Sequence, residues 1–408
     1  MPYPKPFDWK LSLPAAILLM APFDILASLA MDIYLPIVPA MPAVLDTSPA
    51  VVQLTLSLYM ILLGVGQIAF GPLSDRIGRR PVLLGGALAF AVSSFFLAVT
   101  TSATLFVLLR MVQAAGASAA LVATFATVRD VYAERPEGAV IYSLFGSMLA
   151  FVPALGPIGG AIIAENFGWR SIFVALAALA VVATINAVLQ WRETRPMETA
   201  GGKANFGSIL GSPTFWTYTL GFSAAMGAFF VFFSTAPRVL IERAGYSQIE
   251  FSLAFGTAAV VMIVTTRFAK RFVMGWGVPG CLARGMAMLL LGAALLFIGQ
   301  SVAPTPGFAT FVLPMWVIAV GIVFAASVTA NGALRGFDNT AGAAVALYFC
   351  VESVLVAAVG TGLVMVLPGD TAWPLIAYCV IAAIATLISL ACLRRREKPA
   401  TGGDPDAT

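Results

Sequence analysis

The sequence has no histidine among its 408 residues. Histidine-based catalytic triads, histidine-ligated metals and histidine proton shuttles are therefore excluded, and carboxylates become the first candidates for any proton transfer. The four cysteines do not have the spacing of a metal site or of a disulfide framework. A Gly-rich phosphate loop followed by Lys and Ser or Thr is also missing. The sequence accordingly predicts no metal, no cofactor and no use of ATP.

Charged residues are scarce as well. They make up 10% of the chain, against about 25% in soluble domains, and 60% of the residues are apolar. Such a composition cannot build a water-facing surface, so a multi-pass membrane protein is predicted and most soluble enzyme classes are excluded. An integral membrane enzyme or sensor is an alternative, but the clustered His, Asp or Cys typical of such an enzyme is missing.

Apolar runs of about 20 residues, the length that crosses roughly 30 Å of hydrocarbon, recur along the chain. The ten-residue alternation of an outer-membrane barrel is not seen, so the runs are predicted to be helices. The fold class is all-α, with twelve transmembrane helices in two six-helix halves. The spans are expected at residues 12–38, 51–73, 81–100, 104–127, 138–164, 170–191, 214–236, 248–270, 279–300, 308–331, 341–366 and 372–393.

Basic residues predict the orientation of these spans. When alternate loops are assigned to alternate sides, one face keeps only Arg170, Arg238 and Arg243. By the positive-inside rule the richer face is cytoplasmic, so both termini are expected in the cytoplasm. This bias is topological, and no nucleic-acid partner is expected. The richer face holds Lys5, Lys10, Arg76, Arg79, Arg80, Arg129, Arg135, Arg192, Arg195, Lys203, Arg267, Lys270, Arg271, Arg335, Arg394, Arg395, Arg396 and Lys398.

The longest polar stretch between spans divides the chain. Residues 192–213 read as a cytoplasmic linker between an N-terminal half, 1–191, and a C-terminal half, 214–393; residues 394–408 form a cytoplasmic tail. Many transporters consist of two such halves with a substrate site between them near the middle of the bilayer.

Four ionisable residues fall inside the predicted spans: Asp24, Asp32, Arg110 and Glu352. A charge at bilayer depth costs at least about 2.5–3.5 kcal/mol, so such residues are functional candidates. Asp24 and Asp32 lie about 12 Å and about 80° apart on one helix, so both can border one cavity. Arg110 matches the depth of Asp32, and these two are expected to pair. Asp24 is left isolated, and an isolated buried carboxylate binds a proton more readily than a paired one.

Asp24 is therefore the predicted proton carrier, and Pro22 is expected to kink its helix and admit water and substrate. The structural alternative is that the pair of Asp32 and Arg110 only holds two helices together and that Asp24 hydrogen-bonds a neighbour. Glu352 remains open between a second proton site, a substrate contact and a residue kept protonated by burial. Tyr59 and Phe229 are the aromatic residues predicted to line the cavity for a flat, poorly charged molecule.

A specific motif lies between the second and third spans, at residues 71–81 (GPLSDRIGRRP). Gly71 permits close helix approach, Gly78 permits a turn with positive φ, and Asp75 can face the positive end of another helix. Together with Arg76 and Arg79, this stretch resembles the loop signature of the major facilitator superfamily. The resemblance implies a gating role for these five residues.

Two further motifs strengthen the resemblance. Residues 110–116 (RMVQAAG) resemble the family's arginine motif, and residues 156–160 (GPIGG) resemble its antiporter motif, with Val152 where a glycine is usual. Gly156 and Pro157 are thus predicted gating residues, since glycine allows close packing and proline favours a bend.

Over nearly its whole length the chain is similar to bacterial phenicol exporters of the drug–proton antiporter group. Residues 22–36, 125–133 and 229–234 carry this similarity. It implies proton-coupled export of chloramphenicol and florfenicol across the inner membrane of a bacterial cell, with Asp24 and Asp32 in coupling. Arg110 is expected to share in coupling, and the residues expected to bind the substrate are Asp24, Asp32, Tyr59, Phe229 and Glu352. The expected partners are a small amphiphilic drug, protons and the lipid bilayer, and the carrier is expected to be a monomer. A multidrug or small-metabolite proton-coupled transporter is the alternative.

Overall fold

The long apolar runs form helices because backbone N–H and C=O groups can find no partners in lipid and must bond within their own segment. The computed structural model describes residues 11–132, 135–195, 206–303, 305–337 and 341–397, and within these ranges the regular structure is entirely helical. The N-terminal segments (residues 1–10), the central part of the predicted linker (196–205) and most of the predicted tail (398–408) lie outside the described residues.

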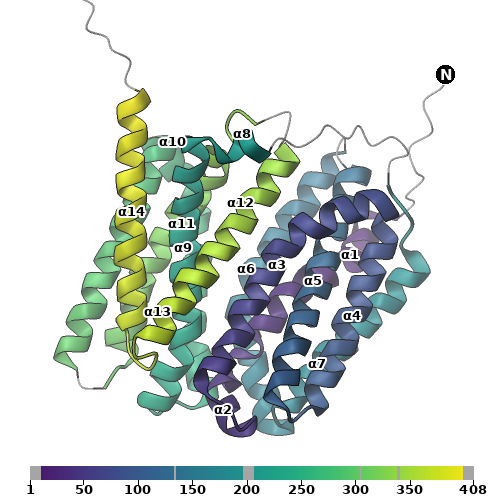
Figure 1. Cartoon of the computed structure of the whole chain (residues 1–408), viewed down its shortest axis with the longest axis horizontal. Coiled ribbons are helices and arrows are strands. Elements are labelled where there is room, and N and C mark those ends of the chain that lie inside the picture. Colours follow the sequence, from purple (N-terminus) through teal and green to yellow (C-terminus); the bar gives the residue numbers. More distant parts are fainter. Residues whose placement is uncertain (1–10, 133–134, 196–205, 304, 338–340, 398–408) are drawn as a thin grey trace, which may run out of the picture.

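The helices fall into two groups that Figure 1 shows side by side. The N-terminal group contains α1 (Leu13–Asp32), η1 (Leu35–Ala40), α2 (Met41–Val44), α3 (Pro49–Ile77), α4 (Arg79–Val99), α5 (Ala103–Tyr132), α6 (Pro136–Phe167) and α7 (Arg170–Gln190). The C-terminal group follows α8 (Phe206–Leu210) and contains α9 (Pro213–Pro237), η2 (Arg238–Arg243), α10 (Gln248–Val302), η3 (Phe308–Val312), α11 (Leu313–Ala333), α12 (Ala341–Leu355), η5 (Val356–Gly360), α13 (Thr361–Val366) and α14 (Trp373–Glu397).

Local signals start and stop these helices. The hydroxyls of Ser48 and Ser212 accept backbone N–H groups at the starts of α3 and α9, and Ser247 forms a capping box with Glu250 at the start of α10. The turn between α3 and α4 occurs at Gly78, whose φ of 110° is favourable only for glycine. The positive φ expected at this residue is therefore confirmed.

Ten helical segments in the described part of the chain are long and apolar enough to cross a membrane, so this is a multi-pass membrane protein. One of them, α10, has 55 residues and contains non-helical backbone at Gly277, where φ is 67°. A shorter apolar stretch, Phe151–Phe167, belongs to α6.

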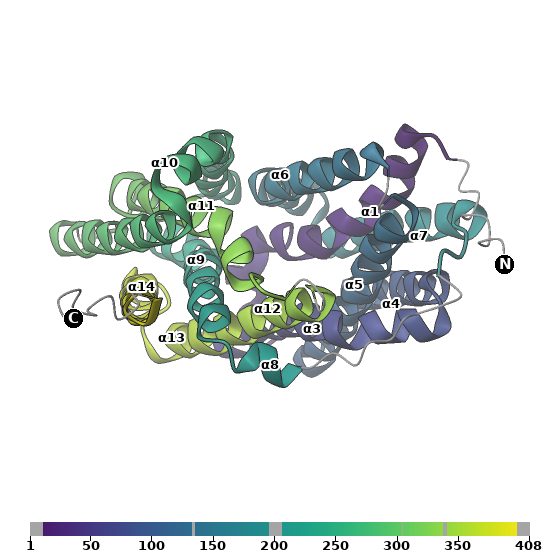
Figure 2. The same ribbon diagram turned by 90° about the horizontal axis from the view of Figure 1, so that it is seen from above.

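Two ends of the bundle are used below to locate residues. The α2 end holds α2 and the turn between α13 and α14; the α8 end holds α8 and the last turn of α14 (Figure 1). Seen from above in Figure 2, α6 lies beside α10 and α12 lies beside α3, so these four helices form most of the contact between the groups.

Candidate functional site

Asp24 lies inside α1, two residues after Pro22. Its side chain is buried, and its Oδ2 atom has no hydrogen-bond partner among the described residues. Pro22 has no N–H group to donate to the carbonyl of Leu18, so α1 lacks one internal hydrogen bond immediately before the acid. Asp24 is thus an isolated carboxyl group at a weakened point of the helix, as the sequence predicts.

Asp32 is the last residue of α1 and is also buried. Gly156 of α6 packs directly against it: a Cβ atom built on Gly156 would lie 2.8 Å from the Cβ atom of Asp32. A Cβ atom on Gly160 would overlap the carbonyl oxygen of Ile33. Glycine at these two positions therefore lets α6 close against the end of α1, whereas Gly159 has no neighbour within 4 Å.

Arg110 of α5 does not form the ion pair with Asp32 that the matching depths predict. Its Nη1 atom donates to the carbonyl of Ala30 at 3.0 Å and to Oε1 of Gln113 at 2.6 Å, and no ion pair of Arg110 is found among the described residues. The carbonyl groups of the last helical turn have no backbone partner and carry partial negative charge. The end of α1 therefore binds the guanidinium in place of the Asp32 carboxylate.

Two tyrosines flank the same guanidinium. The Cζ atom of Arg110 lies 4.5 Å from the ring centre of Tyr59 and 5.1 Å from that of Tyr34. Tyr59 is fully buried and donates to the carbonyl of Ala27 at 2.9 Å. In this structure Tyr59 holds Arg110 and α1 rather than lining an open cavity, so its contact with substrate stays a prediction. The Nε and Nη2 atoms of Arg110 have no partner among the described residues.

The phenylalanines of α9 mostly build the core of the C-terminal group. Phe232 stacks on Phe255 of α10 at a centroid distance of 5.1 Å and is fully buried with Phe230 and Phe233. Phe229 is only partly buried and tilts against Phe255 at 6.1 Å. Of the four phenylalanines between residues 229 and 233, Phe229 is the one that keeps some exposed surface.

Glu352 of α12 is the buried acid of the C-terminal group, with 5% of its surface exposed. Its Oε2 atom accepts a hydrogen bond from the hydroxyl of Ser353 at 3.1 Å. Ser353 in turn contacts α3, because a Cβ atom on Gly64 would overlap the Ser353 side chain. Glu352 therefore lies next to the surface where the two groups meet.

The predicted loop motif forms a charged cluster at the α8 end. Arg79 is buried and pairs with Asp75 at 2.5 Å and with Asp130 of α5 at 2.9 Å. Asp75 thus faces an arginine of its own motif in this structure, while Arg76 is exposed. The close helix approach expected at Gly71 is not present among the described residues, since no atom of another described helix lies within 4 Å of a Cβ atom built there.

Glu193 completes this cluster, and sequence reasoning placed it only in a linker. Its carboxylate accepts the backbone N–H groups of Arg79 at 2.8 Å and Arg80 at 3.1 Å, at the first residues of α4. A carboxylate is favourable at the positive end of a helix. The sequence does show an acid directly after α7, a span that ends on the same face of the membrane protein as the start of α4. Only the fold shows that this acid reaches the first residues of α4.

Hydrogen bonds join the two groups near the α2 end. Gln53 of α3 donates from Nε2 to the hydroxyl of Ser234 of α9 at 3.1 Å, and the hydroxyls of Ser57 and Thr361 are also bonded to each other. The hydroxyl of Ser252 of α10 donates to the carbonyl of Pro157 of α6 at 3.1 Å. These bonds, all between uncharged groups, close the α2 end of the contact.

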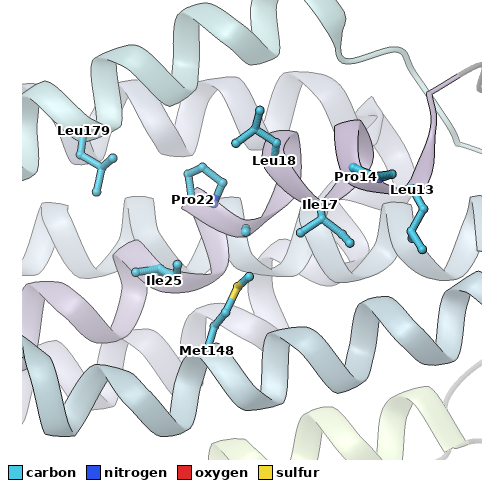
Figure 3. Close-up of a pocket in the computed structure, with 9 residues that line it drawn as sticks. Leu13, Pro14, Ile17, Leu18, Pro22, Ile25, Met148 and Leu179 are labelled. Carbon is cyan, nitrogen blue, oxygen red and sulfur yellow. The ribbon is translucent and has the colours of Figure 1, made fainter.

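An apolar cavity of about 520 Å³ lies along α1. Figure 3 shows Leu18, Pro22 and Ile25 of α1 along its length, with Met148 of α6 and Leu179 of α7 on either side. It has no polar side chain among its lining residues, so the hydrogen-bonding groups of a polar ligand would have no partners there. The cavity is therefore a poor site for a polar drug.

A bundle of membrane-spanning helices in two groups, with buried ionisable residues close to the contact between them, is typical of secondary transporters. The chain belongs to the Major Facilitator Superfamily, whose family model matches residues 24–361. It is 48% identical over 405 residues to a chloramphenicol resistance protein of Pseudomonas aeruginosa, covering 98% of this chain and 96% of the relative. It is 28% identical over 316 residues to the multidrug resistance protein MdtL of Escherichia coli, covering 77% and 79%.

Solved structures show the same fold. The crystal structure of a D-xylose–proton symporter superimposes with a TM-score of 0.73 at 17% identity, covering 93% of this chain and 97% of the other. A bacterial homologue of the human lysosomal transporter Spinster, in an inward-facing and unoccupied conformation, gives a TM-score of 0.69 at 14% identity, covering 94% and 95%. The predicted family is thus confirmed, and the fold is that of membrane transporters.

Proposed function

We propose that the protein is a proton-coupled antiporter that exports the phenicol antibiotics chloramphenicol and florfenicol from the cytoplasm and so gives drug resistance. The observation that carries this proposal is the 48% identity to a chloramphenicol resistance protein across 98% of the chain. The buried acids add a physical basis, because Asp24 forms no ion pair among the described residues and can exchange a proton for a substrate.

The proposed topology has twelve transmembrane segments in two halves, 1–191 and 214–393, joined by the linker 192–213. At 1.5 Å per residue, the 55 residues of α10 would be about 80 Å long, far more than the roughly 30 Å of the hydrocarbon layer. The non-helical backbone at Gly277 supports two spans there, and α6 supplies the remaining one. The basic residues put the α8 end, both termini and the tail 394–408 in the cytoplasm.

In this proposal the α2 end faces outward and is closed, so the structure is a cytoplasm-facing state. Deprotonated Asp24 accepts the drug from the inside, the halves rock, and protonation from outside releases the drug. The protonated carrier then returns. Asp32 and Arg110 transmit the change at Asp24, because Arg110 holds the end of the helix that carries both acids.

Residues of both halves are proposed to contact the drug: Asp24, Asp32 and Tyr59 from the first and Phe229 and Glu352 from the second. The Nε and Nη2 donors of Arg110, which have no partner among the described residues, support the binding of a drug that brings a hydrogen-bond acceptor to this place.

Gating is assigned to the loop cluster of Gly71, Asp75, Arg76, Gly78 and Arg79, and to Gly156 and Pro157 at the closed end. The ion pairs of the buried Arg79 and the bond from Ser252 to Pro157 support this assignment.

The proton gradient suffices as the energy source, with no cofactor. One proton entering down about one pH unit and about 100 mV releases roughly 3.7 kcal/mol, enough for a gradient of a few hundredfold in an uncharged drug. The proposed carrier works as a monomer in the bacterial inner membrane and has no nucleic-acid partner.

Susceptibility to florfenicol and chloramphenicol tests the proposal in cells expressing wild type, Asp24→Asn, Asp32→Asn and Arg110→Ala. Asp24→Asn is expected to abolish resistance while the protein stays in the membrane. Full resistance in Asp24→Asn would remove this residue as the proton carrier. In everted vesicles, adding drug should dissipate a preformed pH gradient, and the absence of this response would exclude antiport.

A second candidate is a multidrug transporter of the same mechanism with a different substrate. The 28% identity to a multidrug resistance protein over 77% of the chain favours it. A panel of unrelated drugs in the same vesicles separates the two, because a phenicol exporter responds only to the phenicols.

A further inference from the structure

We propose that Glu352 is a second proton-binding site, so that two protons enter for each drug molecule exported. This inference rests on the proposed antiport and adds its stoichiometry. It starts from a carboxyl group that is 5% exposed, at a depth where water cannot solvate a charge.

The described residues around Glu352 offer it no positive charge. Among the described residues, the titratable groups that interact with it are Tyr348, one turn earlier on α12, and Tyr378 of α14. Both tyrosines already donate elsewhere, Tyr348 to the hydroxyl of Thr329 at 3.0 Å and Tyr378 to the carbonyl of Ser223 at 2.7 Å. Among the described residues of α3, α9, α11 and α14 no cation pairs with it. A proton is therefore what neutralises the carboxylate in this state.

Glu352 lies at a depth similar to that of Asp24. The bond from Tyr59 to Ala27 ties α3 to α1. Asp24 lies three residues from Ala27 toward the α8 end, or about 4.5 Å along α1. Gly64 lies five residues from Tyr59 toward the same end, or about 7.5 Å along α3. Gly64 contacts Ser353, the neighbour of Glu352. Each group of helices thus holds one buried acid near the same level of the bundle.

The contact at Ser353 couples this acid to the movement of the halves. The Ser353 hydroxyl donates to Glu352, and the same side chain packs against Gly64 of the other half. When the halves rock, α3 and α12 shift at this contact and the surroundings of the carboxyl group change. Glu352 then binds a proton when it is accessible from outside and releases it to the cytoplasm, in step with Asp24.

The drug gradient at zero net flux measures the stoichiometry. Wild-type protein is reconstituted in liposomes, the voltage is held at zero with valinomycin and equal potassium, and the steady chloramphenicol ratio is recorded against the imposed pH difference. Two protons per uncharged drug give a hundredfold ratio per pH unit, and one proton gives tenfold. We expect a hundredfold in wild type and in Glu165→Gln, which removes an exposed acid of α6, and tenfold in Glu352→Gln.

Each result decides between the ideas. A tenfold ratio in wild type overturns the second site and leaves the proposed antiport standing. A hundredfold ratio that persists in Glu352→Gln overturns the assignment to Glu352, and a fall to tenfold in Asp32→Asn would move the site there. A ratio that does not respond to pH refutes the antiport itself. A tenfold wild-type ratio overturns the proposal even where Glu352→Gln does not fold. Glu352→Asp, which keeps the acid, should keep the hundredfold ratio.

Discussion

Replacement of Gly64 by alanine is predicted to shift the protein away from the state with a closed α2 end. Gly64 belongs to α3 of one half and lies against Ser353 of the other. A Cβ atom on Gly64 would overlap both the hydroxyl and the Cβ atom of Ser353. A rotamer change can move the hydroxyl but not the Cβ atom, so α3 and α12 have to separate. The perturbation therefore acts on the contact between the halves.

The size of the effect follows from two opposing contributions. Overpacking of a tight contact costs about 1–3 kcal/mol. Alanine is the better helix former by roughly 0.5–1 kcal/mol, but this gain is the same in both states. Relative to Gly159→Ala, whose added Cβ atom meets nothing within 4 Å, Gly64→Ala should change the ratio of the two states by about 5–150-fold.

Distances between two spin labels measure this ratio. The labels are attached at Asp46 and Glu242, exposed residues at the α2 end of each half, in a background whose native cysteines are replaced by alanine. Gly64→Ala should enrich the longer distances, Gly159→Ala should not, and Ser353→Gly combined with Gly64→Ala should restore the wild-type distribution. If Gly64→Ala matches wild type, the two helices do not have to touch here and the reasoning fails.

Three further outcomes are expected. Asp130→Asn should destabilise the protein by roughly 2–3 kcal/mol in thermal unfolding, less than the loss of a whole buried pair because Arg79 keeps Asp75. Arg110→Lys should impair transport at unchanged membrane abundance, because an ammonium group cannot both bind the end of α1 and stack between two rings. Gly160→Ala should lower the melting temperature, because the added Cβ atom overlaps the backbone of Ile33, whereas Gly159→Ala should leave the melting temperature unchanged.

Much of the fold could be predicted because lipid leaves few alternatives. Apolar length gives the helices, and the positive φ at Gly78 follows from a short turn between two spans. The isolation of Asp24 could also be predicted from the sequence, because charges are rare inside spans and Pro22 lies two residues before this acid.

The pairing of Arg110 could not be read from the sequence in the same way. Depth along two helices is known from residue counts, but the rotation of each helix and the competing acceptor at the end of α1 are properties of the fold. The contacts of Gly64 and Glu193 have the same origin, because both partners are remote in sequence and neither position has a periodicity that reveals the pairing.

The distribution of charge and hydrogen bonds explains how one carrier can be both closed and easy to open. Among the described residues, the ion pairs stay within one half, as with Arg79 and Asp130 in the first and Arg243 and Asp370 in the second. The bonds that cross the halves near the α2 end join uncharged groups, such as Gln53 and Ser234. Three such bonds are worth about 1.5–4.5 kcal/mol in total. One proton moving down its gradient supplies a similar roughly 3.7 kcal/mol per cycle. This end can therefore open in the drug-bound step and close again when the protonated carrier returns, without breaking an ion pair there.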